Sequence, residues 1–439
     1  MSFSPGYRRY VLGSLTLVYT LNSLDVALMI LVLEPIKREL HVSDSQLGVV
    51  TGIAFGLFYS TLGVPFARWV DRGNRVRITS VAIGLWAVTV MSCFFVSNFI
   101  QLVAARLAAG IGESGVLPAT YSLLGDYFRE PAERTRAMTV YMLANPLSPL
   151  IGFIVGGYLL EHVGWRMAFV AIGAPGLVAA LLFRWTIVEP RTAAGQRRSH
   201  QSTSPPLSSV LKTLWRQRTS RHLMFAIILI LTMGFGISPW YAAFMMRSHA
   251  MEAGQLGLWF GLIFGLGGCT GTLLGGYVAS RWFVGDERGQ LRANAWVVGS
   301  QLPLYALFLF VPSGKGALLA LFPLMVAFNY FYGPTYALLQ RLIGDEMRAT
   351  GLMVVMLLAN LIGLGVGPQL IGVMSDLLGS ALGMDSLRYA IFVLSFVALW
   401  AASQLWAASR TVKADLAAVA QAADSRAESV GERMLPSYE

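Results

Sequence analysis

Residues 104–115 read AARLAAGIGESG, so an arginine and a glutamate, Arg106 and Glu113, interrupt a run that is otherwise small and apolar. A charged side chain that faces lipid at the centre of a bilayer costs roughly 2.5–3.5 kcal/mol or more. We therefore expect both side chains to face a protein interior or a water-filled cavity. They are seven positions apart, about two helical turns, so one face of a helix would carry both. The stretch predicts a helical membrane protein with a polar cavity inside it.

The composition of the whole chain also indicates a membrane protein. The 439 residues are 55% hydrophobic and 13% charged, whereas soluble proteins average about 25% charged residues. The net charge of +10 does not indicate a nucleic-acid partner, because the basic residues lie in the loops between apolar runs. Two cysteines within apolar runs, Cys93 and Cys269, predict neither a disulfide framework nor a metal site. We expect no cofactor, because the chain has neither a phosphate-binding loop nor histidines at metal-ligand spacing.

Twelve apolar runs predict twelve transmembrane helices and an all-α membrane protein, since a crossing needs about 20 apolar residues. The expected helices cover about 10–33, 46–70, 77–97, 99–123, 137–160, 167–187, 222–246, 254–282, 293–312, 316–341, 350–374 and 387–409.

One long polar segment divides the helices into two bundles of six. Residues 189–220 are rich in Ser, Thr, Pro, Gln and Arg, which is typical of a linker. A short amphipathic helix near Leu207–Trp215 could lie on the membrane surface. The bundles are therefore expected at 1–188 and 221–409, followed by a tail at 410–439 that is either a frayed helix or disordered.

The basic residues are unevenly divided between the two sets of loops. The set that includes both chain ends and the linker holds most of the arginines, whereas the opposite set holds few basic residues, such as Lys37 and Arg247. Cytoplasmic loops of membrane proteins carry an excess of Lys and Arg. We therefore expect a multi-pass protein of the inner or plasma membrane whose two termini are cytoplasmic.

The two halves of the chain repeat one another. Leu143-Ala144-Asn145 in the first half matches Leu358-Ala359-Asn360 in the second, and a glycine-rich stretch follows each. A duplicated set of six helices with a polar linker is the layout of transporters that rock two bundles about a site at the membrane midplane. The repeat therefore predicts transport by alternating access.

With these motifs in order, the chain resembles the major facilitator superfamily. The turn Asp71–Arg75 is similar to the signature between helices 2 and 3 of that superfamily, and Arg106 with Gly110 and Gly112 resembles its helix 4 motif. The resemblance implies the major facilitator fold, with two bundles of six helices. Within the superfamily the chain resembles the spinster branch of proton-coupled lysolipid and sphingolipid-type carriers. The residues that carry this second resemblance are Leu21–Asp25, Gly110–Glu113, Pro118, Gly164–Arg166, Arg348–Thr350 and Gly365–Pro368.

Two positions depart from the spinster pattern. That pattern usually has an arginine directly after the aspartate of helix 1, where this chain has Val26. Its loop motif normally has a glycine where this chain has Ala67. The valine removes a cation from the expected cavity, which argues against a substrate that carries a phosphate.

The candidate proton-coupling and substrate-cavity residues are Asp25, Arg106 and Glu113. Ionisable side chains inside a membrane domain are typical of proton relays and substrate pathways. Arg106 is the only cation of the three, so a protonation-dependent exchange of Arg106 between Asp25 and Glu113 is a plausible switch. The alternative for each residue is a fixed ion pair that only holds helices together.

Two further sets of residues have a predicted role. The turn after helix 2 and the end of helix 4 are expected to form a conformational latch through Asp71, Arg72, Arg75 and Asp126; the alternative is plain topology-setting charge. Polar and aromatic side chains are expected to line the cavity, with interhelical packing as the alternative, at Asn22, Tyr241, Asn329, Tyr332 and Tyr336.

The sequence therefore predicts a secondary active transporter and not an enzyme, since a membrane enzyme would need a second cluster of buried acids or histidines. It would move a small amphiphile, lysolipid- or drug-like, by alternating access and proton coupling. Its partners would be that substrate, protons and membrane lipids, and it would act as a monomer. Two alternatives stay open: a carrier of the same superfamily for a small polar or organic-anion metabolite, and a non-transporting membrane receptor or channel.

Overall fold

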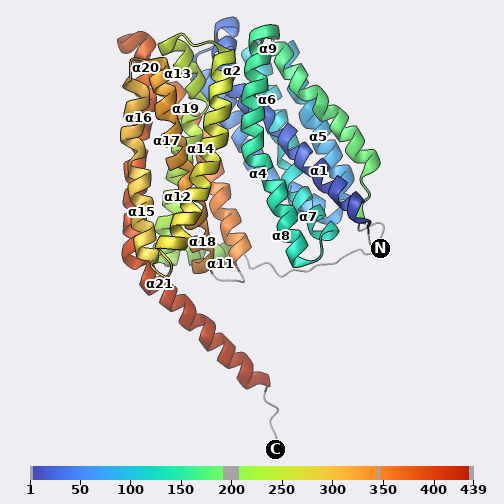
Figure 1. Ribbon diagram of the computed structural model, residues 1–439, viewed down its shortest axis with the longest axis vertical. Coiled ribbons are helices and arrows are strands. Elements are labelled where there is room, and N and C mark those ends of the chain that lie inside the picture. Colours follow the sequence, from blue (N-terminus) through green and yellow to red (C-terminus); the bar gives the residue numbers. More distant parts are fainter. Residues whose placement is uncertain (1–2, 191–206, 344–346, 435–439) are drawn as a thin grey trace, which may run out of the picture.

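The computed structural model describes residues 3–190, 207–343 and 347–434, and every regular element in these ranges is a helix. Figure 1 shows two groups of helices side by side, one from each half of the chain. The predicted all-α fold of two bundles is confirmed.

The first bundle contains the helices up to residue 186. They are α1 (Pro5–Asn22), α2 (Leu24–Leu40), α3 (Asp44–Thr51), α4 (Ile53–Arg72), α5 (Arg75–Ser92), η1 (Cys93–Phe95), α6 (Phe99–Ser114), α7 (Val116–Tyr127), α8 (Pro131–Met142) and α9 (Ala144–Thr186).

The second half of the chain contains the remaining helices. They are α11 (Leu207–Arg216), α12 (Arg218–Ile237), α13 (Trp240–His249), α14 (Ala253–Trp282), α15 (Glu287–Gly299), α16 (Gln301–Phe310), α17 (Gly314–Tyr330), α18 (Tyr332–Ile343), α19 (Arg348–Leu382), η2 (Gly383–Asp385), α20 (Ser386–Ser395) and α21 (Val397–Met434).

The described residues contain ten helical runs that are long and apolar enough to cross a membrane. Two of them, Pro131–Thr186 and Thr350–Gln421, have 56 and 72 residues. At 1.5 Å per residue these would be about 84 and 108 Å long if straight, far beyond a hydrocarbon core of about 30 Å. Each run instead reverses at a glycine with positive φ, Gly164 (φ 76°) and Gly383 (φ 53°). Each therefore holds two crossings, which gives the predicted twelve.

Several crossings are interrupted near their middle. The first crossing breaks at Ser23, between α1 and α2, and the second breaks at Gly52, between α3 and α4. The backbone of Gly52 leaves the helical region (φ −102°, ψ −92°), and a Cβ atom there would lie 2.7 Å from the carbonyl oxygen of Gly365 in α19. Glycine therefore lets the two bundles approach backbone to backbone at this point.

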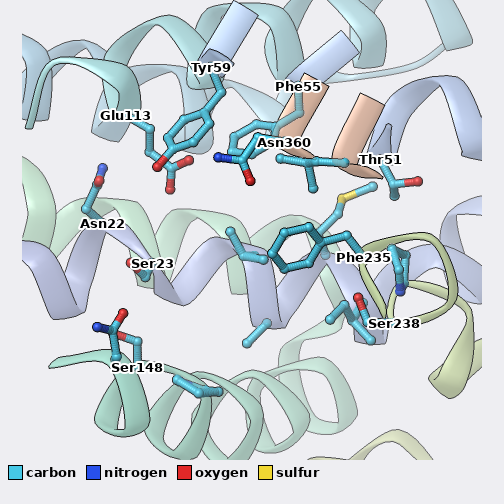
Figure 2. A pocket seen from close by; sticks show the side chains of 18 of the residues that line it. Asn22, Ser23, Thr51, Phe55, Tyr59, Glu113, Ser148, Phe235, Ser238 and Asn360 are labelled. Carbon is cyan, nitrogen blue, oxygen red and sulfur yellow. The ribbon is translucent and has the colours of Figure 1, made fainter. Parts of the chain in front are cut away.

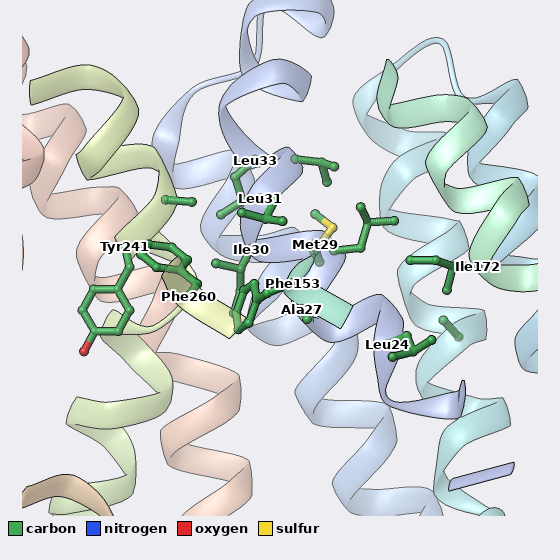
Figure 3. Close-up of a cluster of buried hydrophobic side chains, with 14 of the residues drawn as sticks. Leu24, Ala27, Met29, Ile30, Leu31, Leu33, Phe153, Ile172, Tyr241 and Phe260 are labelled. Atoms are coloured by element: carbon green, nitrogen blue, oxygen red, sulfur yellow. The ribbon is translucent and has the colours of Figure 1, made fainter. Parts of the chain in front are cut away.

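The bundles pack through α9 against α14 and through α3 against α19. A Cβ atom on Gly157 of α9 would lie 2.8 Å from the Cα atom of Gly257 in α14, so this contact also depends on small residues. Nearby, the rings of Phe153 and Phe260 meet edge to face with centroids 5.6 Å apart. Figure 3 shows these two rings with Ile30 of α2 in one apolar cluster. One hydrophobic core therefore crosses from the first bundle to the second.

The segments outside the bundles were only partly predicted. The expected amphipathic helix is present as α11, in which Val210 and Leu214 are buried while Leu211 and Trp215 are exposed. The C-terminal tail continues the last crossing, because α21 runs without a break to Met434 and projects from the bundle in Figure 1. The domain boundaries at 188, 220 and 409 stay a prediction.

Candidate functional site

A cavity of about 550 Å³ lies between the two bundles. Its first-bundle wall includes Asn22, Arg106 and Glu113, and its second-bundle wall includes Phe235 and Asn360. Figure 2 shows Asn22, Glu113, Phe235 and Asn360 surrounding the same space. The charged lining residues come from the first bundle, whereas the described second-bundle lining residues are aromatic, aliphatic or neutral polar. The volume is within the range of about 300–1,000 Å³ typical of small-molecule sites.

Asp25 and Arg106 form a buried ion pair at the cavity wall. Arg106 Nη1 donates to Asp25 Oδ2 at 2.9 Å, and the two side chains are 3% and 0% exposed. Arg106 lines the cavity, while Asp25 lies behind it and does not. The guanidinium also lies over the ring of Phe55, 5.0 Å from its centroid.

This ion pair is incompletely satisfied. Within the described ranges, Asp25 Oδ1 and Arg106 Nε are buried and have no hydrogen-bond partner. A buried pair is stable when hydrogen bonds satisfy its remaining donors and acceptors. The pair therefore has unused hydrogen-bonding capacity beside the cavity.

Glu113 lies two turns after Arg106 on α6 and lines the cavity. Among the described residues, no hydrogen bond or ion pair to its carboxylate is found. Figure 2 shows the side chains of Glu113 and Tyr59 pointing into the same part of the cavity. Because Arg106 is paired with Asp25, the ionised carboxylate of Glu113 faces the cavity without a paired cation. The exchange of Arg106 from Asp25 to Glu113 stays a prediction.

The break between α1 and α2 places two polar residues of the first crossing at the site. Asn22 ends α1 and lines the cavity, and Asp25 falls in the first turn of α2, where the helix dipole favours a carboxylate. On the neighbouring α9, Asn145 accepts a hydrogen bond of 2.8 Å from the hydroxyl of Tyr19. Its counterpart in the sequence repeat, Asn360, also lines the cavity. The repeat therefore brings two equivalent amides to opposite walls.

Four predicted lining residues lie elsewhere in the second bundle. Tyr241 is buried, and its hydroxyl is 2.9 Å from that of Tyr305. Asn329 donates to the carbonyl of Met325 in its own helix. Tyr332 and Tyr336 pack on Phe331 within a separate apolar cluster. None of the four is among the described residues that line this cavity, whereas Asn22 is, and the lining role of the four stays a prediction.

Part of the predicted latch is a buried group of Arg75, Asp126 and Glu189 inside the first bundle, which we call the Arg75 cluster. Arg75 Nη1 lies 2.7 Å from Asp126 Oδ2, and the Arg75 side chain is fully buried. Arg75 also pairs with Glu189, which accepts from the backbone nitrogen of Arg75 at 2.7 Å. The side chains of the other predicted members, Asp71 and Arg72, lie outside the described residues. Sequence analysis missed Glu189, although it is an acid at the start of an otherwise basic linker.

A second polar network, which we call the Arg247 network, joins the bundles at the end of the molecule that holds the α2–α3 turn. Arg247 of α13 donates to both carboxylate oxygens of Asp44 and to Glu34 Oε2, each at 2.7 Å. On α19, the hydroxyl of Ser375 donates to Asp44 at 2.7 Å, and Asp376 accepts from the backbone nitrogens at the start of α3. The network therefore closes the bundles at this end.

Comparisons with known proteins identify the family. The sequence profile described as Major Facilitator Superfamily matches residues 15–368. The chain belongs to the major facilitator superfamily. It is 30% identical over 408 residues to an MFS-type efflux pump of Mycolicibacterium smegmatis, which covers 92% of this chain and 93% of the relative. It is 27% identical to a sphingosine-1-phosphate transporter of Danio rerio, over 88% of this chain and 81% of the relative.

A solved structure places this transporter in the spinster branch. A bacterial homologue of the human lysosomal transporter spinster, in an inward-facing and unoccupied conformation, superposes with a TM-score of 0.82 at 25% identity. The match covers 94% of this chain and 99% of that structure. The chain is therefore a spinster-like major facilitator transporter, as the sequence motifs predicted, and its relatives are transporters and not enzymes.

Proposed function

We propose that this transporter moves a small amphiphilic substrate by alternating access and couples that movement to protons. The observation that carries the proposal is the arrangement of Asp25, Arg106 and Glu113 at the cavity between the bundles. Arg106 and Glu113 line the cavity, and Asp25 is bound to Arg106 directly behind the wall.

The chemistry follows from the unequal pairing of the two carboxylates. Asp25 is bound to Arg106, whereas Glu113 faces the cavity without a charged partner in the described structure. A proton that binds Glu113 removes its charge. Protonation of Asp25 weakens its hold on Arg106, which then moves toward Glu113 if that group is ionised. Arg106 and Glu113 both lie on α6, whereas Asp25 lies on α2, so proton binding at Asp25 releases α2 from α6.

The gating part of the proposal uses contacts at both ends of the bundles. The Arg247 network holds α2 and α3 against α13 and α19, and its release would let this end open. The Arg75 cluster, with Asp126, keeps α5 against the end of α7 in the first bundle. We assign it, together with Asp71 and Arg72, to the conformational latch at the other end.

The remaining parts of the proposal concern the setting of the protein. The chain acts as a monomer in the inner or plasma membrane, with both termini and the linker at 189–220 in the cytoplasm. The bundles are the units 1–188 and 221–409, and the substrate is lysolipid- or drug-like. The excess of arginine in one set of loops supports the orientation.

Proton-driven uptake in proteoliposomes tests the coupling. The purified protein is reconstituted, a pH gradient is imposed, and uptake of a fluorescent lysophosphatidylcholine is followed. We expect Glu113→Gln and Asp25→Asn to lose the dependence of uptake on the pH gradient. Glu133→Gln, which removes a half-exposed carboxylate that pairs with Arg8, is the control and keeps wild-type uptake. If Glu113→Gln and Asp25→Asn both retain the wild-type pH dependence, the coupling assignment is wrong.

A second candidate is the transport of a small organic anion. Arg106 favours it, because this guanidinium lines the cavity and its Nε has no hydrogen-bond partner among the described residues. Carboxylates and phosphates bind arginine in a bidentate manner. Uptake of a radiolabelled sugar acid in the same proteoliposomes would favour this candidate over the amphiphile.

A further inference from the structure

The charges that reach the cavity do not cancel. Its charged lining residues, among those described, are Arg106 and Glu113. Arg106 is already neutralised by Asp25, with Arg106 Nη1 and Asp25 Oδ2 2.9 Å apart. The ionised form of Glu113 therefore leaves one negative charge without a counter-ion. A buried charge without a partner is costly, so a cation that enters the cavity is stabilised there.

The wall near Glu113 is aromatic. Tyr19, Phe55 and Tyr59 line the cavity from the first bundle, and Phe235 and Phe264 face it from the second. The rings of Phe55 and Tyr59 are stacked with centroids 5.6 Å apart. A cation over an aromatic face is attracted by the negative charge density of the ring, more strongly when water is excluded. A carboxylate among aromatic rings is a site for an organic cation, such as an ammonium group.

The position that could supply a second cation is apolar. Val26, next to Asp25, lines the cavity and is 40% exposed, so its side chain faces the space where a substrate would lie. An arginine there would offset Glu113, whereas valine leaves the negative charge in place. An anionic headgroup would therefore meet one unpaired carboxylate and one arginine whose charge Asp25 already balances.

We propose that the cavity selects amphiphiles with a positively charged headgroup, held by Glu113 and the aromatic rings beside it, and rejects those whose headgroup is a phosphate anion. This inference rests on the proposed transport function and deepens it. The other charged and titratable groups near Glu113 are Asp25, Arg106, Tyr19 and Tyr59. Of these, only Arg106 is positive, and it is paired.

The test uses two ions of the same shape and opposite charge. Equilibrium binding of radiolabelled tetraphenylphosphonium and tetraphenylborate is measured on the purified full-length protein at pH 8. For each ion the affinity of a variant is divided by that of the wild type, which removes differences in detergent partitioning. We expect Val26→Arg to lower the affinity for the phosphonium at least tenfold and to raise the affinity for the borate. Val26→Leu, the control for side-chain size, should change the two affinities in the same direction and by a similar factor, because it adds no charge.

A second variant keeps the test decisive if Val26→Arg fails to fold. Glu113→Gln removes the negative charge with little change in volume, and we expect it also to lower phosphonium affinity at least tenfold. Unchanged phosphonium affinity in Glu113→Gln, or in a folded Val26→Arg, would overturn the inference. Uptake of zwitterionic lysophosphatidylcholine driven by a pH gradient is measured in parallel. Uptake without a cation preference refutes only the charge selection, and a cation preference without uptake refutes only the proposed transport.

Discussion

Replacing Arg247 by glutamine should open the end of the molecule that the Arg247 network holds closed. The substitution removes three charge-assisted hydrogen bonds of 2.7 Å, to Asp44 and Glu34. The three side chains are 10%, 3% and 8% exposed. Breaking a buried, hydrogen-bonded charge pair costs about 3–5 kcal/mol. The lower value applies, because Lys37 stays 2.6 Å from Asp44 and partly replaces the lost charge.

The penalty falls on the closed arrangement alone, because the partners of Arg247 belong to the opposite bundle. A difference of about 3 kcal/mol changes the ratio of closed to open molecules roughly 100-fold. The assay is pulsed electron paramagnetic resonance between spin labels at Ile100 and Met384. These side chains are 77% and 73% exposed, and they lie at the closed end of the first and second bundle. We expect a longer distance to become dominant in the variant.

The control is Arg388→Gln. Arg388 lies at the same end of the second bundle, but it pairs with Asp385 of its own bundle at 2.8 Å. Its replacement should leave the distance distribution unchanged. If Arg247→Gln gives the same distribution as this control, the Arg247 network does not hold the bundles together, and the estimate from its hydrogen bonds is refuted.

Three further outcomes follow from the contacts described above. Asp25→Asn should lower the free energy of unfolding by about 3 kcal/mol, since it leaves the buried guanidinium of Arg106 unpaired. A double variant that also carries Arg106→Gln should regain part of the lost stability in thermal-shift assays. Gly157→Leu should increase the distance between the spin labels at the closed end, because a Cβ atom at this position would lie only 2.8 Å from the Cα atom of Gly257. An unchanged distance would show that the helices adjust to the larger side chain without separating. Arg75→Gln should lower the melting temperature by several degrees, whereas Arg77→Gln, at an exposed position, should change stability by less than about 0.5 kcal/mol; equal effects would contradict the role given to the buried cluster.

The crossings were predictable because length and hydrophobicity decide whether a helix spans a bilayer. The cost of exposing charge to lipid identified Arg106 and Glu113, since a charged side chain within an apolar run must face a protein interior or a water-filled cavity. Sequence also indicated that Asp25 belongs with them. It did not indicate that Asp25 is fully buried behind Arg106 instead of facing the cavity, because the depth of a side chain depends on how two separate helices are rotated against each other.

Helix rotation also explains why the cavity lining of the second bundle was hard to predict. An aromatic side chain is tolerated against lipid, against another helix or in a cavity, so composition alone does not distinguish these places. Tyr332 and Tyr336 were therefore expected in the cavity but pack on Phe331. The Arg247 network was missed for a related reason. Its members lie in four separate helices. No local sequence pattern predicts that Arg247 contacts Asp44, which is 203 positions away in the chain.

The uneven division of charge between the cavity walls has a practical consequence for changing the cargo. The ionisable groups of the site belong to the first bundle, which holds Arg106. The second bundle shapes the facing wall through Phe235, Phe264 and Met356. In the proposed mechanism, the first half of the chain binds the proton and the second half sets the shape of the facing wall. If the proposed coupling is correct, a library randomised at those three positions alone should yield transporters with new cargo and an unchanged dependence on the proton gradient.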